Sequence, residues 1–141
     1  GNQIGGNMVG IVVVSHSKAL AKEAITLAME MKHSEFPLIN GSGTDGDYFG
    51  SNPLMIKEAI EKAYTEEGVL VFVDLGSSVL NTQIAIDFLD DSIFNLDHIK
   101  IADAPLVEGL IAAVAINDAK ASLTDIISEL KEFKNFSKIN E

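Results

Sequence analysis

His16 is the residue of this chain whose type and position best suit it for chemistry. It follows the apolar run 10–14 and lies between Ser15 and Ser17. A short apolar run that ends in small polar residues is typical of a buried parallel strand, and ligands meet open α/β sheets just beyond the carboxyl ends of such strands. A helical pattern begins directly after Ser17, so we expect the imidazole at a sheet edge, presented to substrate. His16 is therefore the leading candidate for the chemistry.

Asp74 occupies the equivalent place after a second buried apolar run, residues 69–73. A neutral imidazole nitrogen is a competent nucleophile toward phosphorus when a hydrogen bond holds the other ring nitrogen. Asp74 could supply that hydrogen bond and balance the positive charge of a phosphorylated imidazole. We expect His16 to be the phosphorylated nucleophile and Asp74 to orient and support it. His33 and His98 are expected to be structural.

Four loops rich in glycine and hydroxyl side chains should converge on the same edge of the sheet. Helix starts present backbone N–H groups that favour anions, and glycine lets the backbone approach a phosphoryl group closely. The ten basic residues are all lysines, so no guanidinium can bind phosphate in a bidentate way. Phosphoryl binding is accordingly assigned to Ser15, Ser17, Gly43, Thr44, Gly76 and Ser77.

The composition excludes several classes of function. A formal net charge of -11 argues against a binder of nucleic acid backbones, which needs clustered cations. The absence of cysteine excludes a disulfide framework, a thiolate zinc site and thiol catalysis. No run is long enough to insert in a membrane and no secretory signal precedes the first strand, so we expect a cytoplasmic protein. Residues 8–141 are interpreted as one domain, and residues 1–7, which follow no pattern, as an expression remnant.

Missing motifs narrow the chemistry further. The sequence has no phosphate-binding P-loop, which argues against ATP binding of that type. It also has no Gly-x-Ser-x-Gly elbow, which argues against a serine hydrolase. Asp45 and Asp47 lack the rest of a calcium-loop spacing, and no other ligand set suits a metal. We therefore expect neither a metal nor a resident cofactor. The main alternative is a receiver-like signalling module phosphorylated on Asp74, although the acidic pair that would hold its magnesium is replaced by Ser15-His16-Ser17.

The elements that must position these residues alternate along the chain. Strands are expected at 9–15, 36–40, 69–73 and about 98–102, and helices at 18–32, from Pro53 toward Gly68, around 80–89, and at about 106–119 and 123–134. Such alternation predicts an α/β fold: a three-layer, doubly wound, mainly parallel sheet with strand order 2-1-3-4. In that order the reversal lies between the strands that end at His16 and Asp74. A short extra edge strand within 135–141 is left open.

Three segments carry a resemblance to a known family. Residues 11–17, 73–77 and 104–109 resemble the mannose-type enzyme IIA family of the bacterial phosphoenolpyruvate-dependent phosphotransferase system, and the likeness extends over nearly the whole chain. It implies that His16 matches the family's phosphorylated histidine, with Asp74 beside it. Sugar-directed members usually carry Gly-Gly-Ser-Pro shortly after that aspartate. Here the sequence is Gly76-Ser77-Ser78-Val79, which favours the branch that serves dihydroxyacetone kinase.

This resemblance implies an activity and a set of partners. The protein HPr would phosphorylate the histidine, and the phosphoryl group would pass to ADP on a separate dihydroxyacetone kinase subunit. The resulting ATP would phosphorylate dihydroxyacetone. Family members are typically homodimers, and neither nucleic acid nor membrane insertion is expected. A mannose-type enzyme IIA that feeds a sugar-transporter IIB domain remains the alternative within the family.

Overall fold

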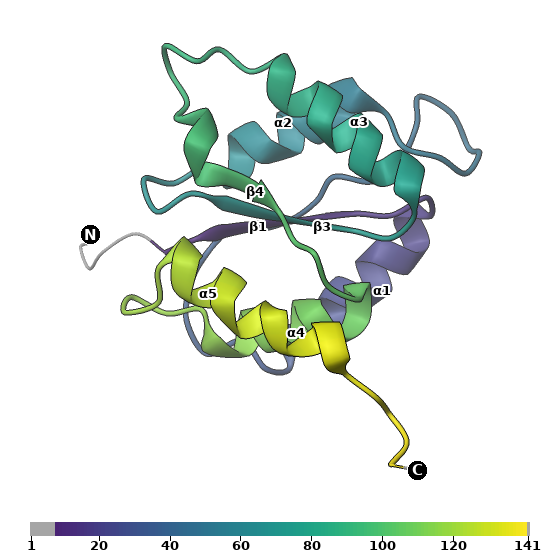
Figure 1. Ribbon diagram of the computed structural model, residues 1–141. Helices are drawn as coiled ribbons and strands as arrows, with labels where there is room; N and C mark the ends of the chain where they lie inside the picture. Colours follow the sequence, from purple (N-terminus) through teal and green to yellow (C-terminus); the bar gives the residue numbers. More distant parts are fainter. Residues whose placement is uncertain (1–7, 141) are drawn as a thin grey trace.

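A parallel four-stranded sheet lies between two layers of helices in the computed structural model, which describes residues 8–140 (Figure 1). The strands are β1 (Gly10–Val14), β2 (Leu38–Asn40), β3 (Val69–Val73) and β4 (Ile99–Ile101), in the order β2-β1-β3-β4. All neighbouring strands pair in parallel. The predicted three-layer α/β fold and its strand order are confirmed. The interpretation of residues 1–7 as an expression remnant falls outside the described residues.

The two central strands are buried on both faces. Every residue of β1 and β3 is buried, and their side chains alternate between two apolar clusters. Ile11, Val13 and Phe72 contribute to one cluster, while Val12 and Val71 contribute to the other. Side chains alternate in this way because successive residues of a strand point to opposite faces of the sheet. Near-continuous apolar runs are typical of such doubly covered strands.

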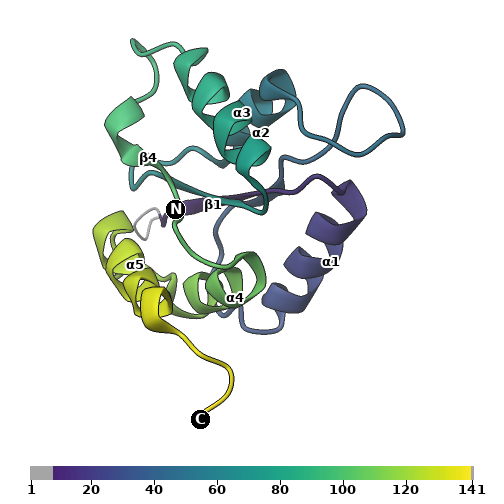
Figure 2. The same cartoon turned by 45° about the vertical axis from the view of Figure 1, so that its right-hand side comes forward.

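Five α-helices and two short 3₁₀ helices cover the sheet. They are α1 (Lys18–Met29), α2 (Pro53–Ala63), α3 (Gly76–Asp87), α4 (Leu106–Ile116), α5 (Leu123–Leu130), η1 (Leu96–His98) and η2 (Lys131–Asn135). Helices α2 and α3 lie on one face of the sheet, and α1, α4 and α5 lie on the other (Figures 1 and 2). Within the described part of the chain, each helix is too short or too polar to cross a membrane.

Three of the expected helix starts are confirmed by their capping contacts. The Ser17 hydroxyl accepts from Leu20 N at 3.1 Å, and Ser122 forms a capping box with Asp125. Asn52 caps α2, whose first residue is Pro53. Helix α3 is different, since no side chain caps it. Ser78 N donates to the Leu75 carbonyl at 2.9 Å, so the N–H groups left without a cap at the edge of the sheet are those of Gly76 and Ser77.

Several helices are shorter in the structure than the sequence predicts. The helix expected over 18–32 ends at Met29, and the one expected over 106–119 ends at Ile116. The last predicted helix, 123–134, becomes α5 followed by the 3₁₀ helix η2. The extra edge strand left open for 135–141 does not form in residues 135–140: Asn135 ends η2, and residues 136–140 do not pair with the sheet.

Helix α3 buries only part of the apolar stripe by which the sequence marks it, which comprises Leu80, Ile84, Ala85, Phe88 and Leu89. Ala85 and Leu89 are buried. Leu80 is 57% exposed and Phe88 is 54% exposed, although both were expected to mark the helix. Its buried positions include Ser78, Thr82 and Ala85. Small residues let α3 lie close to α2 and the sheet, so size rather than hydropathy decides which side faces inward.

Candidate active site

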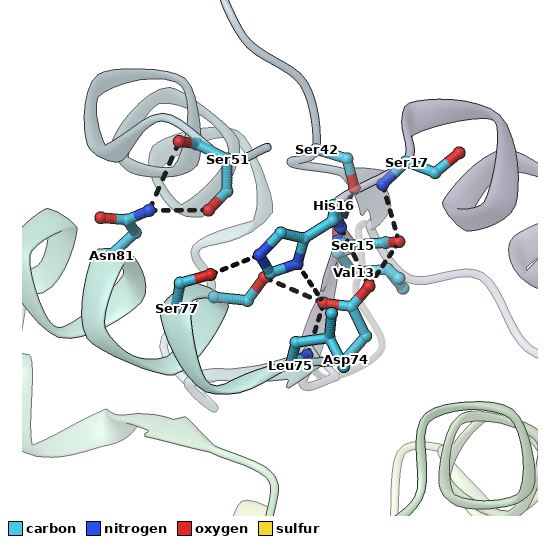
Figure 3. Close-up of polar contacts among 11 residues, drawn as sticks. Val13, Ser15, His16, Ser17, Ser42, Ser51, Asp74, Leu75, Ser77 and Asn81 are labelled. Carbon is cyan, nitrogen blue, oxygen red and sulfur yellow. Dashed lines mark hydrogen bonds and ion pairs between the residues drawn. The ribbon is translucent and has the colours of Figure 1, made fainter. Parts of the chain in front are cut away.

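The ends of β1 and β3 bring His16 and Asp74 into direct contact. Val14 pairs with Val73 in the parallel register, so the residues that follow them leave the sheet side by side. His16 Nδ1 lies 2.9 Å from Asp74 Oδ1 (Figure 3). The imidazole is 25% exposed and the carboxylate 17% exposed. A largely buried carboxylate thus holds the ring at Nδ1, while part of the ring remains exposed to solvent.

Five donors surround the two oxygens of Asp74. Oδ1 accepts from Leu75 N at 2.6 Å, from His16 Nδ1 at 2.9 Å and from Ser78 Oγ at 3.0 Å. Oδ2 accepts from Ser15 Oγ at 2.7 Å and from His16 N at 2.9 Å. An ionised carboxylate offers about four lone-pair positions, so this one is saturated. Its orientation is fixed from several directions at once.

These hydrogen bonds keep the carboxylate charged. Burial by itself raises the pKa of Asp74. Hydrogen bonds from the His16 backbone and ring, from Ser15 and from Leu75 lower it by more, and the net result is a pKa well below the usual range for aspartate. Asp74 is therefore an anion at neutral pH and a weak base that does not take the proton of the imidazole.

The hydrogen bonds also select the tautomer of His16. Because Asp74 can only accept, Nδ1 carries the proton, and Nε2 is left with its lone pair. Nε2 faces the hydroxyl of Ser77 in a close contact on the exposed side of the ring (Figure 3). That hydroxyl can donate to the lone pair. The ring is thus in the state that a nucleophilic nitrogen requires, with Nε2 on the side away from Asp74.

Ser15 and Ser17 lie on the inner side of this arrangement. Ser15 is completely buried, and its hydroxyl donates to Asp74 and accepts from Ser17 N at 3.0 Å. The Ser15 amide donates to Ser42 Oγ at 2.8 Å, which ties the end of β1 to the loop after β2. The structure thus places the Ser15 hydroxyl beneath the carboxylate, away from Nε2. Ser17 stays at the rim as the cap of α1.

An open cleft of about 590 Å³ lies on the other side of His16. Gly43, Thr44 and Lys18 line it together with the histidine. Gly50 N donates to the His16 carbonyl at 2.8 Å, and its φ of 141° is a conformation that favours glycine. Loop 41–50 is therefore anchored to the His16 backbone while its outer part extends into solvent (Figures 1 and 2).

The six residues assigned to phosphoryl binding fall into separate places. Gly76 and Ser77 begin α3 on the Nε2 side, and a Cβ added at Gly76 would meet nothing within 4 Å. Gly43 and Thr44 lie across the cleft, where the Thr44 hydroxyl donates to Gly46 O at 3.0 Å within its own loop. The start of α3 thus offers free N–H groups and open space close to Nε2, whereas Thr44 has its hydroxyl turned inward.

Sequence reasoning missed two buried serines of the site. Ser78 contacts both Asp74 and the His16 ring, and Ser42 holds the Ser15 amide. Ser78 follows Asp74 by four residues, one helical turn, and an α3 start at Gly76 would have indicated the contact. Ser42 was hidden because serine in a glycine-rich loop is ordinarily a turn residue.

A further contact that sequence reasoning missed joins α3 to the residue after loop 41–50. Asn81 Nδ2 donates to Ser51 Oγ at 2.7 Å and links α3 to the end of loop 41–50 (Figure 3).

His33, which was expected to be structural, lies outside this site and contacts the Ala115 carbonyl oxygen at 2.7 Å. Among residues 8–140 no three His, Cys, Asp or Glu side chains come together as metal ligands, and Asp45 instead accepts from the Tyr48 hydroxyl.

The chain is similar to proteins of known family along most of its length. Residues 10–127 match the family model EIIA-man, described as "PTS system fructose IIA component". The phosphoryl donor subunit DhaM of PEP-dependent dihydroxyacetone kinase 2 from Listeria innocua is 33% identical over 123 residues, covering 87% of this chain and 97% of that protein. DhaM of Providencia stuartii is 34% identical over 128 residues, or 89% of this chain. The chain spans only 26% of that longer relative.

A solved structure gives an independent comparison. The crystal structure of EF1359, a protein of unknown function, has a TM-score of 0.75 and 32% sequence identity, and the match covers 92% of this chain and 97% of that one. The family match spans both strands that end at the site, β1 with His16 and β3 with Asp74. The chain therefore belongs to the mannose-type enzyme IIA family of the phosphotransferase system and is of the DhaM type of phosphocarrier.

Proposed function

We propose that this chain carries a phosphoryl group on Nε2 of His16, taking it from phosphorylated HPr and passing it to ADP held on a dihydroxyacetone kinase subunit. One observation carries the proposal: Asp74 accepts from Nδ1 at 2.9 Å, which leaves the lone pair on Nε2, where it faces the Ser77 hydroxyl. The relatives named as phosphoryl donor subunits of PEP-dependent dihydroxyacetone kinase support the choice of acceptor.

The first step is an in-line displacement at phosphorus. The Nε2 lone pair attacks, the N–P bond of the donor phosphohistidine breaks, and its electron pair returns to the donor ring. The proton on Nδ1 stays in place, so the His16 ring becomes a positively charged, phosphorylated imidazolium. Asp74, already ionised and 2.9 Å away, stabilises that charge without having to move.

The start of α3 suits the incoming phosphoryl oxygens. The Ser77 hydroxyl must turn away from Nε2 when the N–P bond forms, and it can then donate to a phosphoryl oxygen. The uncapped N–H groups at Gly76 and Ser77 favour an anion in the same place. Backbone N–H groups thus take the part that arginine plays in many phosphate sites.

The alternative chemistry at Asp74 is less well supported. A receiver-like module would need a carboxylate oxygen free to attack phosphorus. Both oxygens of Asp74 are taken by hydrogen bonds, three on Oδ1 and two on Oδ2. The carboxylate is therefore a poor nucleophile. Transfer to a sugar-transporter IIB domain remains the alternative acceptor, and the Gly76-Ser77-Ser78-Val79 sequence argues for the kinase.

The remaining parts of the proposal concern the whole protein. We propose that residues 8–141 form one enzyme IIA domain that works in the cytoplasm as a homodimer, without a resident cofactor. Transfer to ADP needs magnesium and cationic groups. The kinase subunit has to supply both, since the cleft beside His16 contains a single lysine, Lys18. The net charge of -11 suits docking to a basic patch on a partner.

The test is phosphorylation by a reconstituted pathway. Incubation with phosphoenolpyruvate, enzyme I and HPr should add one phosphoryl group by intact mass, and the adduct should be labile in acid and stable in alkali. His16→Gln should fold normally and take up no phosphoryl group, because the glutamine amide is not nucleophilic. Full labelling of His16→Gln would refute the assignment, and an alkali-labile adduct would favour Asp74.

The acceptor needs a separate experiment. Phosphorylated protein mixed with ADP and magnesium alone should form no ATP. Adding the ADP-loaded kinase subunit, its dihydroxyacetone-binding subunit and dihydroxyacetone should discharge His16 and form dihydroxyacetone phosphate. Discharge to a mannose-type IIB protein, with none to the kinase subunit, would overturn the acceptor and leave the His16 carrier step intact.

A further inference from the structure

Ser78 is a buried hydroxyl that contacts both members of the His16–Asp74 pair. Its side chain lies in the first turn of α3 and is completely buried. Ser78 Oγ lies 3.0 Å from Asp74 Oδ1 and 3.2 Å from His16 Nδ1. Because Asp74 is ionised, the hydroxyl must donate its proton to the carboxylate. It therefore acts on the same oxygen that accepts the imidazole N–H.

We propose that Ser78 is a positioning residue that sets how readily phosphorylated His16 gives up its phosphoryl group. The inference rests on the proposed function, in which His16 Nε2 carries the group. Ser15 also donates to Asp74, but to Oδ2, the oxygen that the ring does not use. Ser78 is thus the side-chain hydroxyl that competes with the imidazole for Oδ1.

The effect follows from the charge that forms on the ring. When Nε2 bonds to phosphorus and the donor N–P bond breaks, the ring gains a positive charge and keeps its Nδ1 proton. When an acceptor attacks phosphorus, the Nε2–P bond breaks, its electron pair returns to Nε2 and the ring is neutral again. The Nδ1–H···Oδ1 bond is consequently stronger in the phosphorylated state. Negative charge on Oδ1 stabilises that state.

A hydrogen bond from Ser78 draws negative charge from Oδ1 and weakens its attraction for the phosphorylated ring. Removing the hydroxyl should stabilise phosphorylated His16 and make it a poorer donor. The Ser78 lone pair also faces Nδ1, but that contact is longer, 3.2 Å against the 3.0 Å between Ser78 Oγ and Asp74 Oδ1, and the hydroxyl is a neutral acceptor. The charged partner at Oδ1 dominates, so the expected direction is toward the phosphorylated state.

An equilibrium measurement separates this role from a merely structural one. A ring that has lost its orientation should react more slowly in both directions, and the ratio of the two rates stays the same. A changed attraction between Asp74 and the charged ring alters that ratio. The equilibrium constant for phosphoryl exchange with HPr therefore reports the role of Ser78 directly.

The experiment mixes phosphorylated HPr with the full chain, wild type or Ser78→Ala, and measures both phosphorylated species at equilibrium by intact mass. Ser78→Ala should shift the equilibrium constant toward phosphorylated His16 by about three- to tenfold, the range expected for one hydrogen bond. Discharge to the acceptor should slow by a similar factor. An unchanged constant, or a shift toward phosphorylated HPr, would overturn the proposal.

Two further variants guard against trivial explanations. Thr82→Val removes a buried hydroxyl one turn along the same helix, without touching Asp74, and should leave the equilibrium constant unchanged. Ser78→Cys keeps a side chain of similar size with a weaker donor, and its shift should fall between wild type and Ser78→Ala. The cysteine variant gives the answer if alanine prevents folding.

A readout on the unphosphorylated protein distinguishes failure of this inference from failure of the proposed function. In Ser78→Ala the Nδ1 proton of His16 should move downfield in the NMR spectrum, because its bond to Oδ1 becomes stronger. If HPr transfers nothing to the wild-type chain, the proposed function fails even if that proton moves. If transfer occurs and neither the proton nor the equilibrium constant changes, only the role of Ser78 is refuted.

Discussion

Two segments meet at His16, and their polar side chains have different partners. We call residues 74–78 the α3 entry and residues 41–50 the glycine loop. The α3 entry directs its carboxylate and hydroxyls at the imidazole. In the outer part of the glycine loop the polar side chains bond within the loop itself: Thr44 donates to the Gly46 carbonyl, and Tyr48 donates to the Asp45 carboxylate.

The side chains that hold the imidazole are also less exposed than those of the outer glycine loop, although Leu75, Gly76 and Ser77 are exposed and residues 41–43 are buried. In the α3 entry Ser78 is completely buried and the Asp74 carboxylate is 17% exposed. In the glycine loop Phe49 is 82% exposed and Tyr48 is 64% exposed. A saturated, covered network holds a reacting group in one geometry, whereas exposed aromatic side chains are what partner proteins bind. We therefore expect the chemistry at the α3 entry and partner recognition at the glycine loop.

The largest effect should come from the carboxylate of the α3 entry. Asp74→Asn preserves shape but lets the amide present either a donor or an acceptor to Nδ1, and it removes the charge that balances the phosphorylated ring. Transfer from HPr should slow by roughly two to four decades, by analogy with other histidine–aspartate pairs. Rapid-quench measurement of the phosphorylation rate checks this.

The matched control changes the same residue type in the other segment. Asp45→Asn in the glycine loop removes a carboxylate that contacts Tyr48 rather than the imidazole, and it should leave the rate of transfer within a factor of a few of the wild type. Equal losses in both variants would show that net charge, and not contact with His16, controls the rate.

A smaller effect, on binding alone, is expected from the glycine loop. Phe49→Ser removes an exposed aromatic ring at the cleft, so KM for phosphorylated HPr should rise by about three- to tenfold while kcat stays constant. Ile93→Ser is the control, because this 67% exposed residue lies in the loop before β4 and outside the cleft. A fall in kcat without a change in KM would move the glycine loop into the chemistry.

The carboxylate of the α3 entry should also affect how the unfolding free energy changes with pH in the acid range. The pKa of Asp74 is lower in the folded protein than its ordinary value of 3.8, so the unfolded chain binds the proton more tightly. The stability that Asp74 contributes is complete above about pH 3.8 and is lost as the pH falls through the folded pKa. The difference in unfolding free energy between wild type and Asp74→Asn should narrow below that pH. Denaturant titrations across the acid range measure it.

The same contrast explains how much the sequence could predict. Apolar runs and capping residues predicted the order of the elements, and the reversal in strand order brought His16 and Asp74 to one edge of the sheet. These signals are local, since a few adjacent residues are enough to indicate a buried strand or a helix cap. The contact between the two residues follows from the parallel register of β1 and β3.

Ser78 and Ser42 could not be predicted in this way. The role of Ser78 depends on which side of α3 faces inward, and Ser42 lies in a glycine-rich loop, where serine is ordinarily a turn residue. In α3 the apolar stripe indicated that Leu80 and Phe88 face inward with Ala85 and Leu89, whereas the helix exposes the first two and buries Ser78 and Thr82. Close packing against α2 needs small side chains at that interface, and hydropathy carries no such information. The phosphoryl-binding role of Thr44 stays a prediction, and its hydroxyl is bonded within the glycine loop.

The smallest effect should come from the second buried hydroxyl of α3. Ser78 donates to Asp74, whereas Thr82, one turn further along, is completely buried and its Oγ1 has no hydrogen-bond partner among the described residues. Thr82→Val replaces that hydroxyl by a methyl group of similar size, so the unfolding free energy should rise by about 1 kcal/mol. Transfer rates should not change, because Thr82 does not contact the pair. Chemical denaturation measures the difference, and a loss of stability would indicate that a buried water binds Oγ1. If stability rises instead, the two hydroxyls of α3 differ in one respect. Ser78 has a carboxylate that accepts its hydrogen bond, whereas the buried hydroxyl of Thr82 has no acceptor within residues 8–140 and lowers the unfolding free energy.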